Sequence, residues 1–234
     1  MGKLSVFAGV AGSVALAGSA EAALQSLSMD LIRSGAEGNT YHLFANVDSG
    51  ARVDAVFGNA QGALSIDTAN GASFYQNANG GPLSSDINDN FFPFVPSMEW
   101  DSYVTIGSQY QDGGPVAPAN ELDTIGISFQ DFEAFGTDEI FSDGGTWFVT
   151  PSDVQGEEVS GQVLLGQFTV QGGIGDASDI IGQINIQGQD IGGNTWQAIG
   201  ASWSTVVVPE PSTALLIGLG LTGLAGKGGR RSRS

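Results

Sequence analysis

The chain has 234 residues, with 25 acidic residues, 7 Lys or Arg and a formal net charge of -18. The imbalance is steeper between residues 23 and 208, where Arg33 and Arg52 face 23 acidic residues, for a net charge of about -21. Nucleic acids and anionic lipids are bound mainly through Lys and Arg, so this composition argues against both as partners. The chain has no cysteine, which excludes a disulfide framework and any Cys–His site.

The N-terminus has the pattern of an export signal. Lys3 precedes an apolar run from Leu4 to Ala17, and small residues, Ala20 and Ala22, stand at the two positions that a signal peptidase reads. We therefore predict that residues 1–22 form an N-terminal signal helix that signal peptidase removes after Ala22.

The region from residue 23 to residue 207 is predicted to consist of short strands. Clusters of Gly, Asn and Asp such as Asn79-Gly80-Gly81 mark turns, and apolar and polar residues alternate between them. The predicted strands lie within residues 27–31, 41–47, 53–57, 64–66, 100–106, 125–129, 146–150, 162–170, 180–187 and 195–203.

About ten strands at this spacing predict an all-β fold, a single β-sandwich of Greek-key or jelly-roll type over residues 23–207. The length of this region favours one domain, and no linker divides it. A β-helix is the alternative, but the sequence has no fixed internal period to support it.

One loop has oxygen-bearing side chains at the spacing of a calcium ligand set. Asp86, Asn88 and Asn90 alternate as in the first half of an EF-hand loop, and Ca²⁺ prefers oxygen ligands. Phe91 stands where an EF-hand has its turn glycine, and Ser97 where it has its closing Glu, which excludes an EF-hand. A looser Ca²⁺ site and an Asx-rich turn without metal are the two remaining interpretations.

Two other kinds of site depend on how the side chains are arranged. Aromatic side chains that face one side could stack on sugar rings, although aromatic residues in strands also form cores. The candidates are Trp100, Tyr103, Trp147, Trp196 and Trp203. A glycosidase would need two neighbouring carboxyls in a cleft, and Glu99, Glu121, Glu133 and Glu139 are the available glutamates in the middle of the chain.

Catalysis by the single histidine is not indicated by the sequence. His42 lies in an alternating strand, and no Gly-x-Ser-x-Gly elbow accompanies it. We predict a solvated histidine or one at the edge of a sheet, and we expect no enzymatic activity.

The C-terminal tail, residues 208–234, combines three features. Pro209, Glu210 and Pro211 form a stretch that disfavours helix and sheet pairing. The apolar run from Thr213 to Gly226 would make a helix of about 21 Å, shorter than the roughly 30 Å of a bilayer core. A basic cluster follows, which holds the end of the chain in the cytoplasm and leaves the preceding residues outside. It comprises Lys227, Arg230, Arg231 and Arg233.

This tail resembles the PEP-CTERM sorting signal of exported bacterial proteins. The resemblance implies an exosortase-type processing enzyme as a partner and export across the inner membrane of a Gram-negative bacterium. It also implies a short transmembrane helix that anchors the chain transiently, followed by release to the cell surface or extracellular matrix. We therefore expect a structural or adhesive surface protein. A carbohydrate-binding module of the extracellular polysaccharide matrix is the alternative, and a glycosidase is a third.

Overall fold

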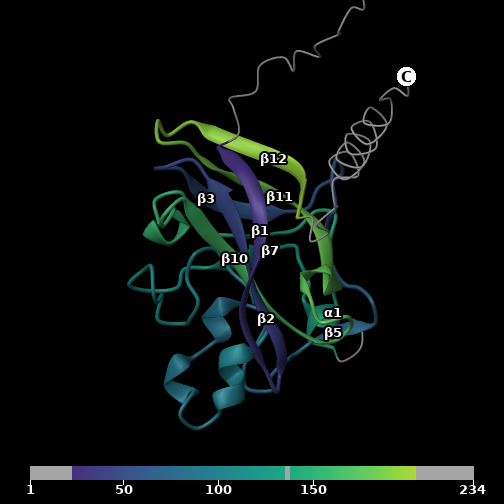
Figure 1. Cartoon of the computed structure of the whole chain (residues 1–234). Coiled ribbons are helices and arrows are strands. Elements are labelled where there is room, and N and C mark those ends of the chain that lie inside the picture. The colour runs from purple at the N-terminus through teal and green to yellow at the C-terminus, as the bar shows by residue number, and fades with distance from the viewer. Residues whose placement is uncertain (1–22, 135–137, 204–234) are drawn as a thin grey trace, which may run out of the picture. The chain divides into compact units, whose positions relative to one another are not determined.

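The computed structural model describes residues 23–134 and 138–203, which form a sandwich of two antiparallel β-sheets (Figure 1). The first sheet has the strand order β1-β2-β10-β5, and β6 also pairs with β10. Its strands are β1 (Leu24–Gly35), β2 (Gly38–Val47), β5 (Ala72–Phe74), β6 (Tyr103–Val104) and β10 (Gln162–Gly172).

The second sheet has the order β7-β9-β3-β11-β4-β8, and β12 also pairs with β11. The chain passes between the sheets after β2, β4, β6, β9 and β10, so neither sheet is built from one continuous segment. The strands of the second sheet are β3 (Arg52–Phe57), β4 (Leu64–Thr68), β7 (Asp123–Ile125), β8 (Glu139–Ser142), β9 (Thr146–Phe148), β11 (Ile180–Gln189) and β12 (Thr195–Ser202).

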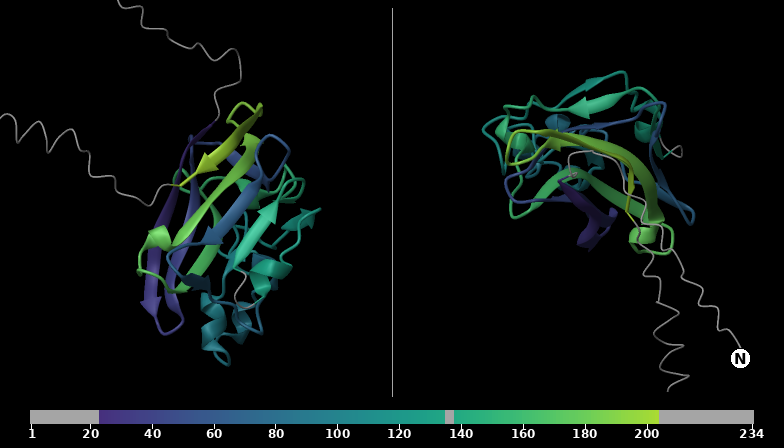
Figure 2. Two further views of the ribbon diagram at one scale, coloured as in Figure 1. Left: turned by 90° about the vertical axis from the view of Figure 1, so that its right-hand side faces the viewer. Right: turned by 90° about the horizontal axis from the view of Figure 1, so that it is seen from above.

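Short helical turns lie in the connections. They are η1 (Ser84–Asp86), η2 (Asp89–Phe91), η3 (Pro96–Trp100), α1 (Gln130–Glu133), η4 (Val154–Gly156) and η5 (Ala177–Asp179). The turns η1 to η3 gather at one end of the sandwich, and the start of β1 and β12 lie toward the other end (Figures 1 and 2). Within the described residues, no helix is long and apolar enough to cross a membrane.

The core forms where alternate strand residues of the two sheets meet. In β2 the residues Tyr41, Leu43, Ala45 and Val47 are all buried, as the period of two requires. The register between β10 and β2 shifts between Leu164 and Gly166. This bulge changes which residues of β10 face inward. The buried apolar residues of β10 that pack in the core are Val163, Leu165, Phe168 and Val170.

A second, smaller core stabilises the long connection from β5 to β7. Ile87, Met98 and Tyr103 are buried together, with Phe92 and Tyr110 packed against them. The Phe92 and Tyr110 rings meet edge to face at 5.5 Å. This connection therefore has a packed interior of its own although its only regular elements are short helical turns and the two-residue strand β6.

The predicted sandwich is confirmed, and most predicted strands overlap observed ones. The predicted strand at 100–106 was too long, because η3 extends to Trp100 and only Tyr103 and Val104 pair with β10. The predicted strand at 125–129 was misplaced, because β7 ends at Ile125 and Gly126 turns the backbone with a φ of 69°. Strands β5 and β8 were missed. The predicted signal helix and transmembrane helix lie outside the described residues.

Phe168 tests the aromatic part of the core. It is 0% exposed, and its ring lies 5.5 Å from that of Phe74 and 6.3 Å from that of Phe132. Truncating such a residue costs about 3–5 kcal/mol, so Phe168→Ala should lower the free energy of unfolding by that amount in urea titrations. The control is Phe141→Ala, since Phe141 is 52% exposed. Equal losses in the two variants would contradict the assignment of this core.

Candidate functional site

A pocket of about 370 Å³ opens beside the first sheet, where β5 meets α1. Residues 74–78 form one wall, Glu133, Ala134 and Asp138 line another part, and Gln171 of β10 contributes at the end of its strand. The pocket is therefore built by segments that lie far apart in the sequence and are brought together by the packing of the core.

Phe132 places α1 at this pocket. It is 0% exposed and its ring lies 5.3 Å from that of Phe74, so α1 is fixed to the core and its last residue, Glu133, reaches the pocket. Gln76 Nε2 donates a hydrogen bond of 2.9 Å to the carbonyl of Phe132. Phe132 thus positions both α1 and the pocket wall formed by residues 74–78.

Two acceptor atoms beside the pocket have no donor among the described residues. Glu133 Oε1 and Gln76 Oε1 are buried and form no hydrogen bond with the described part of the chain. Burial, together with the negative charge of Asp86, raises the pKa of Glu133 to about 7. Asp138 Oδ1 accepts a hydrogen bond of 2.9 Å from the Phe74 amide, and burial raises the pKa of Asp138 as well. The pocket thus offers hydrogen-bond acceptors and a carboxyl that exchanges its proton near neutral pH.

Asp101 holds the wall of the pocket in place. Its side chain is 0% exposed and accepts hydrogen bonds from the amides of Asn77 at 2.6 Å, Gly81 at 3.1 Å and Ser102 at 3.1 Å. A Cβ at Gly80 would collide with Asp101 Oδ2, so the backbone approaches this carboxyl as closely as only glycine permits. Burial raises the pKa of Asp101 to about 8, although the three amides act in the opposite direction.

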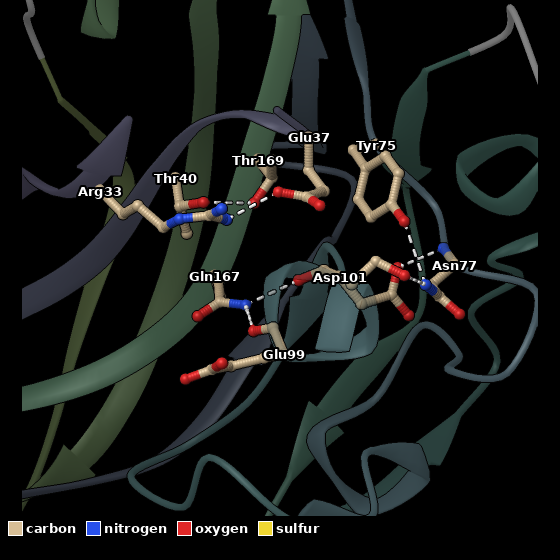
Figure 3. Close-up of polar contacts among 10 residues, drawn as sticks. Arg33, Glu37, Thr40, Tyr75, Asn77, Glu99, Asp101, Gln167 and Thr169 are labelled. Carbon is tan, nitrogen blue, oxygen red and sulfur yellow. Dashed lines mark hydrogen bonds and ion pairs between the residues drawn. The ribbon is translucent and has the colours of Figure 1, made fainter. Parts of the chain in front are cut away.

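Gln167 joins this region to the first sheet (Figure 3). Its Nε2 donates to the carbonyls of Glu99 at 3.0 Å and Asp101 at 2.8 Å. Its Oε1 lies 3.0 Å from His42 Nε2 on the neighbouring strand, so the histidine donates there. Figure 3 also shows Asn77 directed at the hydroxyl of Tyr75, which it contacts at 3.0 Å.

His42 is therefore a buried structural residue. It is 7% exposed on β2, between β1 and β10, which corrects the expectation of a solvated or edge histidine. Burial lowers its pKa, which keeps the ring neutral and its single N–H group directed at Gln167.

The aromatic platform considered from the sequence does not form. Tyr103, Trp147, Trp196 and Trp203 are 0%, 0%, 2% and 7% exposed, and they belong to the interior. Trp100 is half-buried, with the guanidinium of Arg33 4.0 Å above its ring centre. A cation over an aromatic face occupies the surface that a sugar ring would need.

The glutamates considered for hydrolysis are distributed over the domain. Glu99 lies in η3, Glu121 before β7 and Glu139 in β8, and Glu133 is the one that lines the pocket. Asp138, Asp101 and Gln76 were not predicted. No periodic pattern marks them in the sequence, because all three act through loops whose positions depend on tertiary packing.

The predicted calcium ligands lie in consecutive turns. Asp86 Oδ2 accepts a hydrogen bond of 3.2 Å from the Leu83 amide, and Asn88 Oδ1 accepts from the amide and side chain of Asn90 at 3.1 and 3.2 Å. Across residues 23–134 and 138–203, no three His, Asp or Glu side chains are grouped to hold a metal ion. A Ca²⁺ site formed by Asp86 together with Asn88 and Asn90 remains a prediction.

The comparisons with known proteins concern the tail. The family model described as the PEP-CTERM protein-sorting motif matches residues 207–232. The searches of curated proteins and of solved structures found no match. The chain thus carries an exosortase sorting signal, which marks an exported, membrane-anchored protein of the cell surface. The motif residues Pro209, Glu210 and Pro211, the basic cluster and the cleavage residues Ala20 and Ala22 lie outside the described residues.

Asp101 predicts that the domain loses stability as pH rises. Its pKa is about 8 in the folded state, against 3.8 for an unperturbed aspartate, so the native state holds more protons between these values. The free energy of unfolding must then fall with increasing pH. Asp101→Asn cannot titrate, and it should reduce the fall between about pH 5 and about pH 8 by up to about 4 kcal/mol.

Urea unfolding at several pH values measures this difference. The Asn variant also loses the acceptor for the Gly81 amide, so the slope against pH is the informative quantity rather than the stability at one pH. Asp123→Asn, which removes an exposed carboxyl on β7, is the control for the loss of one charge. Parallel pH dependences for wild type and Asp101→Asn would contradict the prediction.

The calcium prediction is tested by melting the protein in NaCl and CaCl₂ of equal ionic strength. Both salts screen repulsion among the acidic side chains. Only a specifically bound Ca²⁺ ion stabilises the folded state beyond this screening. At a hundredfold excess over Kd, binding would add about 2.7 kcal/mol and raise the midpoint by about 6 to 10 °C. Asp86→Ala should abolish the difference, whereas coincident wild-type curves would leave only screening.

Proposed function

We propose that the chain is a non-catalytic structural or adhesive protein of the cell surface or extracellular polysaccharide matrix of a Gram-negative bacterium. Signal peptidase removes residues 1–22, and an exosortase-type enzyme acts on the tail after the short transmembrane helix has anchored it. The observation that carries this proposal is the sorting motif at residues 207–232. The apolar run before Ala20 supports export independently.

The pocket supports a binding role better than a hydrolytic one. Glycoside hydrolysis uses two carboxyls whose pKa values are driven apart, so that one is protonated while the other is charged. Here Glu133 and Asp138 share the pocket, and burial raises the pKa of both. Asp101 is fully buried and cannot touch a substrate.

A carbohydrate-binding role is the second candidate. It would use the pocket rather than the buried tryptophans. The observation in its favour is that Tyr75 lines the same concave site as four polar residues, which are Gln76, Asn77, Glu133 and Gln171. Amide and carboxyl side chains beside an aromatic ring are suited to the hydroxyls and the apolar faces of sugars.

Terminal mass analysis of material from the cell surface tests the main proposal. We expect the protein to begin at Ala23 and to have lost the residues that follow Pro209-Glu210-Pro211. A variant with neutral residues at the basic cluster should be released or mis-sorted while its sandwich still folds, because these residues act on orientation and retention. Surface protein that retains residues 227–234, or a variant with unchanged fractionation, would contradict the proposal.

A further inference from the structure

Strand β1 forms one edge of the first sheet. This strand pairs with β2 along one side, and within residues 23–134 and 138–203 no strand pairs with its other side. Figure 2 shows β1, in purple, as the outermost strand of this sheet in its left-hand view. A free edge presents unpaired N–H and C=O groups that can accept another strand.

The second half of β1 has apolar side chains that the domain does not cover. Leu24, Leu27 and Met29 pack against the core, whereas Leu31 is 56% exposed and Ile32 is 47% exposed. The register with β2 shifts between Leu31 and Arg33, so Ile32 is an additional residue in β1. This bulge leaves both apolar side chains exposed beside the free edge.

The segment Asp30-Leu31-Ile32-Arg33, in which only Arg33 is half-buried, is complementary to itself. If two copies pair antiparallel about a point between Leu31 and Ile32, Asp30 of each lies opposite Arg33 of the other. Leu31 of each then lies opposite Ile32 of the other, and the two bulges coincide. Cross-strand pairs of opposite charge and of apolar side chains are the pairs that stabilise antiparallel sheets.

The charges of the domain single out this register. Arg33 and Arg52 are the only basic residues between residues 23 and 208. Arg52 is buried, with ion-pair contact to Asp54 and a hydrogen bond of 2.7 Å to the Asp153 carbonyl. Arg33 bridges Glu37 at 2.8 Å through one terminal nitrogen and lies over the Trp100 ring, and its side chain is 29% exposed on the second half of β1. Among the described residues, Arg33 is thus the one Arg or Lys that a second copy can reach, and this register places the Asp30 carboxylate of that copy against it.

We propose that β1 is a self-pairing edge and that two copies of the chain join antiparallel through residues 30–33, which extends the first sheets into one continuous sheet. The partner is a second copy, because the segment complements its own charges. This proposal does not depend on the sorting signal. The pairing can therefore fail while the proposed function holds, and the proposed function can fail while the pairing holds.

Sedimentation of the full chain, purified in a nonionic detergent, tests the pairing. Asp30→Arg places Arg opposite Arg33 twice in each dimer and should raise the dissociation constant at least about tenfold, since two favourable pairs become repulsive. Asp123→Arg is the matched control, because it makes the same charge change at an exposed position on β7, an edge strand of the other sheet. It should leave the dimer intact.

Mixing two variants tests the register itself. Asp30→Arg and Arg33→Asp should each dimerise poorly alone and form a heterodimer together, because every cross-strand pair is then opposite in charge. Amide hydrogen exchange of the wild type provides a measurement that needs no variant. Residues 28–35 should become more protected as concentration rises, while residues 123–125 should not.

Four results would overturn the proposal. They are a wild type that stays monomeric at all concentrations, equal effects of Asp30→Arg and Asp123→Arg, a mixture of variants that does not associate, and exchange in β1 that is independent of concentration.

Discussion

The position of Gln167 decides how the long connection from β5 to β7 lies on the first sheet. A buried amide must have its donors and acceptor paired, since each unpaired group costs about 1–3 kcal/mol. Gln167 meets this requirement by bonding two carbonyls of the connection and the ring of His42. The second of these carbonyls belongs to Asp101, whose side chain fixes Asn77 and Gly81. Gln167 of β10 therefore helps to position the pocket wall at Asn77, through its contact with Asp101.

The charge of the domain is balanced almost entirely by solvent and by backbone amides. Several acidic side chains act as internal acceptors: Asp179 receives amides from Ile174 and Gly175, and Asp190 receives those of Gly192 and Asn194. Burial raises the pKa of Asp179, but its hydrogen bonds outweigh burial and lower the pKa overall. The pKa of Asp190 is lowered mainly by the hydrogen bond from the Asn194 side chain, and the amides add to this. Turns rich in Gly and Asn thus give many carboxylates a structural role, which helps to explain how the fold tolerates so few basic residues.

The sandwich could be predicted because the alternating apolar residues of strands such as β2 lie on the face that packs in the core. The errors arose where that relation fails. Ile127 and Phe129 alternate and pack against the core, yet they do so from a loop, so their pattern imitates a strand. Strands β5 and β8 are three and four residues long, too short for alternation to identify them.

The pocket could not be predicted for a different reason. The carboxyls that matter there, Glu133 and Asp138, resemble the surface acids in local sequence. Their distinct behaviour comes from the burial of Phe132 and from the approach of residues 74–78, which are more than fifty positions away in the chain. The tail was readable from sequence alone because its signal is recognised as a linear segment, through composition and order rather than through folding.

The location of Ala23 has a consequence for the proposed removal of a leader during export. Ala23 is 2% exposed, it packs with the core cluster, and its carbonyl accepts a hydrogen bond of 2.9 Å from the Asp48 amide. A peptidase binds the residues around its scissile bond in an extended form, which this packed position does not allow. Under the proposed function, removal of a leader after Ala22 would have to precede closure of the sandwich, so that processing at this end would compete kinetically with folding.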